Sequence, residues 1–174
     1  MGMSHAQFGR IERALLRHVT LDQLCRACSA VGLRLTARAM PGGGATVDAG
    51  QLGILARFRL LLPPATPFDT EVPLPIPGDL RAWDGAFRLQ GVLIAAEAEG
   101  RLHDLQAQQR RWRLKLRDGG VDLLILAIAD TRWNRAVLDE QRETLRATFP
   151  LDGRQLRPLL RAGRAPDANG IIVL

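Results

Sequence analysis

The chain has few cysteines, which cross-link small secreted proteins, and no long apolar run, which would anchor a protein in a membrane. It contains 2 cysteines in 174 residues, which excludes a disulfide framework and fits a reducing cytoplasm. No apolar run approaches the roughly 18 residues that a bilayer-spanning helix needs, so we expect no membrane partner. Residues 1–10 also lack the apolar stretch of a secretion signal.

Lysine is scarce too, although the chain is basic. Lys115 is the single lysine, and the other 23 of the 24 basic residues are arginines. With 18 acidic residues the formal net charge is +6, which favours an acidic partner such as DNA. Residues 1–40 and 101–174 are basic, whereas residues 41–100 carry seven acids against four arginines. This distribution fits a cation site beside a polyanion-binding surface, and it also fits ordinary scatter of charge.

Two helices and an extended arm are predicted at the start of the chain. Apolar residues recur at helical spacing over 4–16. Thr20 and Gln23 form a capping-box pattern that begins a second helix, which ends at Gly32. Alternating apolar and polar residues over 33–39 then predict a short strand or extended arm.

Cys25 and Cys28 have the spacing of a redox or zinc pair. Both lie on the apolar stripe of the second predicted helix, and no further pair is present to complete a zinc site. We therefore expect them to be buried.

Residues 47–174 follow a glycine-rich linker at 41–46 and show the pattern of an α/β domain. The predicted order is helix, three strands, helix, strand, two helices and a last strand. Gly85 or the Gln90–Gly91 pair is expected to supply the turn between the second and third strands. The helices are predicted at 47–62, 101–118, 132–148 and 153–162, and the strands at 69–76, 80–89, 91–99, 121–129 and 171–173.

Three acidic residues lie on two neighbouring predicted strands. Asp84 comes late in one strand, and Glu97 and Glu99 end the next, where strand alternation points both glutamates to one face. Three carboxylates on one face repel one another unless a cation lies between them, and Mg²⁺ prefers oxygen ligands of this kind. Such an ion activates water in phosphoryl transfer. The alternative is that these acids end the strand and point into solvent.

The order helix, three strands, helix, strand over residues 47–130 resembles the common core of the PD-(D/E)XK nuclease superfamily. Asp84 matches the acid on the second strand of that superfamily, and Glu97 matches the acid on the third. The resemblance implies a restriction-endonuclease-like fold and, if the domain is catalytic, Mg²⁺ held by Asp84, Glu97 and Glu99. Glu99 stands where the superfamily has lysine. Lys115 is not expected to replace it, because it lies about 21 Å along the following helix.

That following helix, 101–118, is rich in arginine. Arg110 and Arg113 are candidate DNA contacts, because cations on an exposed helix can track phosphates. A solvated helix face is the alternative. Gln106 lies one turn before Arg110, and related nucleases use a glutamine near the start of this helix.

Residues 4–35 resemble the second half of a lambda-repressor-like (XRE-type) helix-turn-helix domain, through the stretch Ser-His-Ala-Gln-Phe-Gly-Arg-Ile-Glu and the helix after it. The resemblance implies that Ser4, Gln7 and Arg10 face DNA. Ala14 stands where the family has glycine, and the two helices that precede the recognition helix are missing. The alternative is an amphipathic helix pair that packs on a partner.

Together these features predict a restriction-endonuclease-like α/β domain, a mixed sheet flanked by helices, preceded by a small partial helix-turn-helix segment at residues 1–40. The combination resembles bacterial helix-turn-helix regulators whose C-terminal domains look like degenerate nucleases. It implies a cytoplasmic, dimeric, DNA-binding transcriptional regulator without cofactor. Two alternatives stay open: a metal-dependent nuclease that uses Asp84, Glu97 and Glu99, and an antitoxin-like module that uses residues 1–40 as its contact surface.

Overall fold

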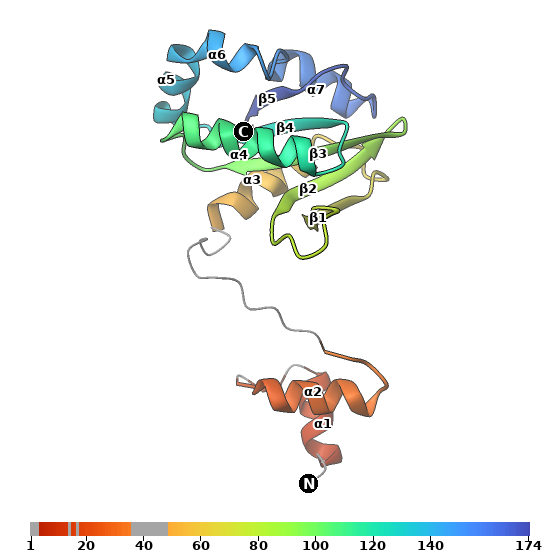
Figure 1. Cartoon of the computed structure of the whole chain (residues 1–174). Helices are drawn as coiled ribbons and strands as arrows, with labels where there is room; N and C mark the ends of the chain where they lie inside the picture. The colour runs from red at the N-terminus through yellow and green to blue at the C-terminus, as the bar shows by residue number, and fades with distance from the viewer. Residues whose placement is uncertain (1–3, 14, 17, 36–48) are drawn as a thin grey trace. The chain divides into compact units, whose positions relative to one another are not determined.

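The computed structural model describes residues 4–13, 15–16, 18–35 and 49–174. The chain divides into two units, Met1–Gly44 and Ala45–Leu174 (Figure 1). The linker predicted at 41–46 lies outside the described residues. Of the predicted arm at 33–39, residues 33–35 are described and form no strand.

The first unit contains two helices in its described part, α1 (His5–Glu12) and α2 (Leu21–Ala30). The Ser4 side chain caps α1, which is shorter than predicted. Thr20 and Gln23 form the predicted capping box at the start of α2.

These two helices bury very little apolar surface between them. Ala27 is the one buried side chain among the described residues of this unit. The prediction that both cysteines are buried is wrong, because Cys25 is exposed and Cys28 is half-buried. The described part of this unit therefore has almost no core. Its exposed large apolar residues are Leu15, Leu21, Val31 and Leu33.

The second unit is a mixed α/β domain, as predicted, built on an open five-stranded sheet with strand order β1-β2-β3-β4-β5. The first three strands are antiparallel, whereas β3, β4 and β5 run parallel. Parallel neighbours need a crossover, and the helix α4 (Leu105–Asp118) provides the one between β3 and β4. The strands are β1 (Phe68–Pro73), β2 (Ala82–Leu89), β3 (Val92–Glu99), β4 (Leu123–Ile128) and β5 (Gly170–Val173).

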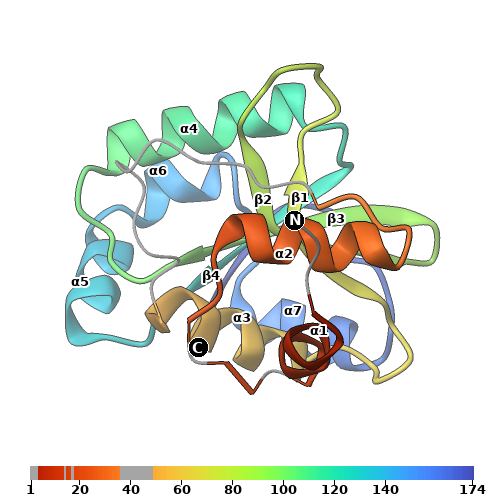
Figure 2. The same cartoon turned by 90° about the horizontal axis from the view of Figure 1, so that it is seen from below.

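Helices cover both faces of this sheet (Figure 2). The helices α3 (Ala49–Arg59) and α7 (Gly153–Arg161) pack on one face, around Phe58, Leu156 and Leu160. On the other face α4 packs with α6 (Arg142–Arg146), around Trp112 and Phe149. The single helix predicted at 132–148 is in fact two, because Gln141 ends α5 (Arg132–Glu140) with ψ near 16°. No helix in the described part of the chain is long and apolar enough to cross a bilayer.

Gln90 and Gly91 form the turn between β2 and β3. This pair and Gly85 are the two alternatives that the sequence predicts for that turn. Both have positive φ, 51° and 86°, which is the backbone of a tight two-residue hairpin. Gly85 serves packing instead. A Cβ there would lie 2.4 Å from Cζ of Phe68, so only glycine lets this ring pack against β2.

Candidate functional site

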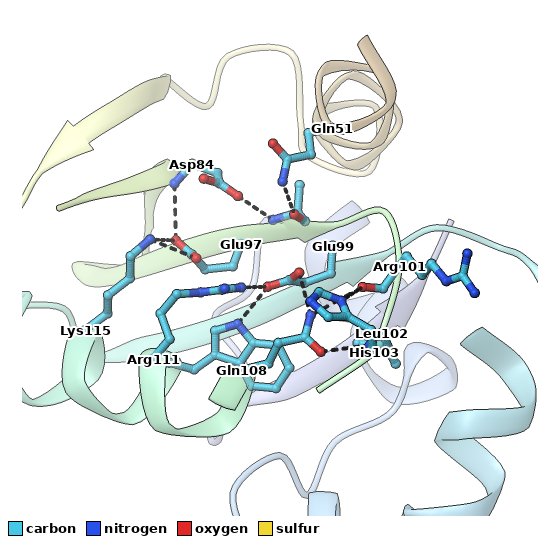
Figure 3. A network of polar contacts seen from close by, with 12 residues as sticks. Gln51, Asp84, Glu97, Glu99, Arg101, Leu102, His103, Gln108, Arg111 and Lys115 are labelled. Atoms are coloured by element: carbon cyan, nitrogen blue, oxygen red, sulfur yellow. Dashed lines mark hydrogen bonds and ion pairs between the residues drawn. The ribbon is translucent and has the colours of Figure 1, made fainter. Parts of the chain in front are cut away.

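The candidate site lies between β3 and α4 (Figure 3). The chain leaves β3 at Glu99, and α4 then runs back over that strand. Gln108 therefore lies beside Glu99, and Lys115, two turns further along the helix, lies beside Glu97. Both glutamates face α4, as strand alternation predicted.

Glu97 is paired with the single lysine of the chain. Lys115 Nζ lies 2.7 Å from Oε1 and 2.9 Å from Oε2 of Glu97. The same ammonium donates to the Ala82 carbonyl oxygen at 2.6 Å. Oε1 also accepts from the backbone N–H of Asp84 at 3.3 Å. Glu97 is 3% exposed and Lys115 is 7% exposed, so this is a buried ion pair.

Glu99 has a separate set of partners on the same helix. Its Oε1 accepts from Trp112 Nε1 at 2.9 Å and forms an ion pair with Arg111. Its Oε2 accepts from Gln108 Nε2 at 3.0 Å. Glu99 is 6% exposed and Glu97 is 3% exposed. The alternative interpretation, in which these acids point into solvent, is therefore wrong for both glutamates.

Asp84 bridges β2 and β3 at the point where their pairing ends. The last paired residues are Gly85 and Ala96. Beyond them, Asp84 Oδ2 accepts from the Ala98 N–H at 2.8 Å and so replaces a ladder hydrogen bond. Gln51 of α3 donates to the Ala98 carbonyl oxygen at 3.3 Å. Side chains from two elements thus hold the backbone of β3 between its two glutamates.

The protonation of Glu97 is sensitive to this setting. Burial, together with the negative charge of Asp84, raises the pKa of Glu97 to about 7, while Lys115 acts in the opposite direction. A carboxyl that titrates near neutrality is unusual and marks either a functional site or a buried structural pair.

The structure does not bring Asp84, Glu97 and Glu99 into one group. The two glutamates are held apart on different residues of α4, and Asp84 binds the backbone of Ala98. Within the described ranges, no three acidic, histidine or cysteine side chains are placed to hold a metal ion. The cations that neutralise the glutamates are the side chains of Lys115 and Arg111.

Sequence reasoning did not assign to the site the four residues of α4 that serve the glutamates, and the expectation that Lys115 lies too far along the helix to reach it is wrong. A signal for them was present, since positions three or four apart share one face of a helix. The glutamine predicted to matter, Gln106, is exposed, whereas Gln108 is 1% exposed and faces Glu99. These four residues are Gln108, Arg111, Trp112 and Lys115.

The outer face of α4 carries the predicted DNA contacts of this domain. Arg110 and Arg113 are exposed, and neither forms an ion pair with any described residue. They line a shallow depression with Gln106, Gln109 and Arg117. Because the inner face of α4 is buried, these side chains stand on a rigid support.

The predicted DNA contacts of the first unit lie on α1. Ser4 Oγ accepts from the Gln7 backbone N–H at 3.2 Å, so this hydroxyl already caps the helix. Ser4 and Arg10 are exposed, and Gln7 is half-buried.

Comparison of the chain with protein-family models, curated proteins and solved structures finds no significant match.

Proposed function

We propose that the protein is a DNA-binding transcriptional regulator of the lambda-repressor-like kind, with a restriction-endonuclease-like C-terminal domain that does not cleave DNA. The observation that supports the proposal is that the inner and outer faces of α4 carry different side chains with different partners. The inner face neutralises Glu97 and Glu99, and the outer face presents Arg110 and Arg113, which form no ion pair with any described residue.

The inner face supports the absence of cleavage. A catalytic carboxylate needs a free oxygen to hold a metal ion or to take a proton from water. Each oxygen of Glu97 and Glu99 instead accepts from a protein donor. Satisfied and nearly inaccessible acids of this kind stabilise the contact between a helix and a sheet.

The outer face supports DNA binding. At 1.5 Å rise per residue, Arg110 and Arg117 lie about 10 Å apart along the helix axis. This length covers about three phosphates of one DNA strand at 3.4 Å each. Arg113 lies between them, so the helix presents a short row of guanidinium groups, of which Arg117 is paired with Asp118.

The test measures DNA binding by fluorescence anisotropy at several salt concentrations. It compares the full chain with an Arg110→Gln/Arg113→Gln variant. The variant is expected to bind about tenfold more weakly at low salt, because two phosphate contacts are lost. The slope of log affinity against log salt is expected to fall by about 2, roughly one for each lost contact.

The matched control is Arg161→Gln. Arg161 is exposed at the end of α7, on the opposite face of the sheet from α4. It should leave both affinity and salt slope unchanged. An equal loss in the control and in the double variant, or no DNA binding by the native chain, would refute the proposed interface.

The first unit and its exposed apolar residues support the proposed dimer. Leu21 is 58% exposed and Val31 is 56% exposed in this structure. Apolar side chains of this size gain stability when a second surface covers them. We expect a mass twice that of the chain in light scattering, with a shift toward the monomer in a Leu21→Ser/Val31→Ser variant.

A second candidate function is a metal-dependent nuclease. Lys115 favours it, because this lysine reaches Glu97 beside Asp84, although Glu99 stands at the position where the superfamily has lysine. Against it, the described residues do not form the three-acid site that would hold the metal ion.

A cleavage assay separates the two functions. Native protein is incubated with single- and double-stranded DNA and RNA in Mg²⁺ and in Mn²⁺, beside an Asp84→Ala/Glu97→Ala variant whose folding is checked by circular dichroism. The regulator predicts no cleavage by either protein. Cleavage that the folded variant loses would establish the nuclease instead.

A further inference from the structure

A cavity of about 540 Å³ lies beside the edge strand β5, away from the glutamates on β3. Its walls come from α5, α6 and the first turns of α7, and β5 contributes Ile171 and Val173. None of Asp84, Glu97 or Lys115 lines it. Its volume is within the range of about 300–1,000 Å³ that is typical of small-molecule sites.

Arginine dominates the polar lining of this cavity. Two arginines, Arg135 and Arg142, are already paired with aspartates of the same lining. Three others, Arg146, Arg154 and Arg157, form no ion pair with any residue that the structure describes.

The remaining aspartate of the lining does not neutralise these three arginines. Asp152 Oδ1 accepts from the backbone N–H groups of Arg154 and Gln155 at 2.8 and 3.2 Å, and so caps α7. Arg157 donates to the Val173 carbonyl oxygen at 2.6 Å, which orients its side chain along β5. The lining thus carries five arginines against three aspartates, and no described acidic residue pairs with Arg146, Arg154 or Arg157.

The other part of the lining is apolar. Leu145 and Phe149 are 4% and 3% exposed and line the cavity together with Ile171. Phe149 is fixed by an edge-on contact with Trp112 of α4, with ring centroids 5.8 Å apart. An apolar surface beside unpaired cations selects ligands that carry an anionic end and an apolar body.

We propose that this cavity is a binding site for a small organic phosphate, with the phosphate held by Arg146, Arg154 and Arg157 and the apolar body against Leu145 and Phe149. Arginine forks match phosphate oxygens in pairs, and a phosphate dianion offers three oxygens to several guanidinium groups at once. A carboxylate offers only two oxygens and one charge, so it fits three arginines less well.

The test is isothermal titration calorimetry of the full chain with phenyl phosphate, inorganic phosphate and benzoate. Phenyl phosphate is expected to bind one site per chain, about tenfold more tightly than inorganic phosphate, because its ring is removed from water. It should also bind more tightly than benzoate. An Arg146→Gln/Arg154→Gln variant should lose about tenfold or more in affinity, because charge-assisted hydrogen bonds are removed.

Arg161→Gln again serves as the control, since Arg161 lies on α7 but does not line the cavity. Unchanged phenyl phosphate binding in this variant, and in the presence of saturating duplex DNA, would assign the cavity to a small molecule. The proposal is overturned by absence of binding at millimolar phenyl phosphate, by equal losses in both variants, by benzoate binding as well as phenyl phosphate, or by displacement with DNA.

Discussion

Lys115 Nζ lies 2.7 Å from Glu97 Oε1, because α4 begins at Leu105, after β3 has ended at Glu99, and runs back over that strand. Two residues of a strand rise about 6.6 Å and four residues of a helix about 6 Å. Glu99 with Arg111 and Glu97 with Lys115 are therefore successive contacts between an outgoing strand and a returning helix. Together they define where α4 sits along β3.

Removing one member of the buried pair should cost more than removing both. Lys115→Met leaves the Glu97 carboxyl buried next to Asp84, and we expect the free energy of unfolding to fall by about 3 kcal/mol. A Glu97→Leu/Lys115→Met variant should recover most of that loss, because no charge is left unpaired. Urea denaturation measures both. A double variant less stable than either single variant would contradict this account.

The pH dependence of stability should carry the signature of Glu97. Its pKa is about 7 in the folded chain and near the usual 4.5 when unfolded, so the folded state holds the proton more tightly between these values. The contribution of this group to the free energy of unfolding is therefore present below pH 4.5 and is lost as the pH rises through 7, by at most about 3 kcal/mol.

The measurement compares native protein with Glu97→Gln, which cannot titrate, in urea at pH values from 4.5 to 7.5. The stability of the native protein relative to the variant should fall across this range. A relative stability that rises with pH would mean that Lys115 outweighs burial and lowers the pKa of Glu97.

The strands of the second unit could be predicted from sequence because their signals are local. Val92 to Ala98 is an almost continuous apolar run, and the Gln90–Gly91 turn takes the positive φ values that its hairpin needs. The break at Gln141 could not be predicted in this way. Apolar periodicity continues through it, and only the backbone angles of Gln141, φ −101° and ψ 16°, show where α5 ends and α6 begins.

The candidate site was predictable only in part. Alternation along β3 correctly places Glu97 and Glu99 on one face, because this needs only neighbouring residues. Their partners depend on the direction in which α4 crosses the sheet. Because α4 begins at Leu105 and not at residue 101, Lys115 lies about 15 Å along the helix instead of the predicted 21 Å. That length does not separate Lys115 from the glutamates, because the helix folds back over the strand that it leaves.

Asn134 is a buried polar residue that no sequence pattern indicated. Its Oδ1 accepts from the Leu102 N–H at 2.8 Å, and its Nδ2 donates to the carbonyl oxygens of Gly100 and Ala129 at 3.0 and 2.9 Å. Asn134→Ala leaves the Leu102 N–H and the Gly100 carbonyl oxygen without a partner, whereas the Ala129 carbonyl oxygen keeps the Thr131 N–H, and we expect a loss of about 3 kcal/mol in urea unfolding. Thr131→Ala, which removes only the cap of α5, should cost about 1 kcal/mol. If Asn134→Ala and Thr131→Ala lowered the free energy of unfolding equally, water would be replacing the hydrogen bonds of the Asn134 amide.

Gly119, directly after α4, should tolerate no side chain. A Cβ at this position would lie 2.4 Å from Cζ2 of Trp83 and 2.5 Å from the Lys115 carbonyl oxygen. Because Trp83 is fully buried and Lys115 is held by Glu97, neither can move away without breaking a contact. Gly119→Ala should therefore lower the free energy of unfolding by about 2 kcal/mol. It should also change the near-ultraviolet circular dichroism of the tryptophans.

Gly100→Ala is the matched comparison, because a Cβ at Gly100 meets no atom within 4 Å and its φ is not positive. It should be neutral or stabilising by up to about 1 kcal/mol, since alanine restricts the unfolded chain. If both variants unfold at the same urea concentration, Trp83 can shift to make room. The end of α4 would then not be fixed against β2 by Trp83, and the position of Lys115 would depend on its contacts with Glu97 and the Ala82 carbonyl oxygen.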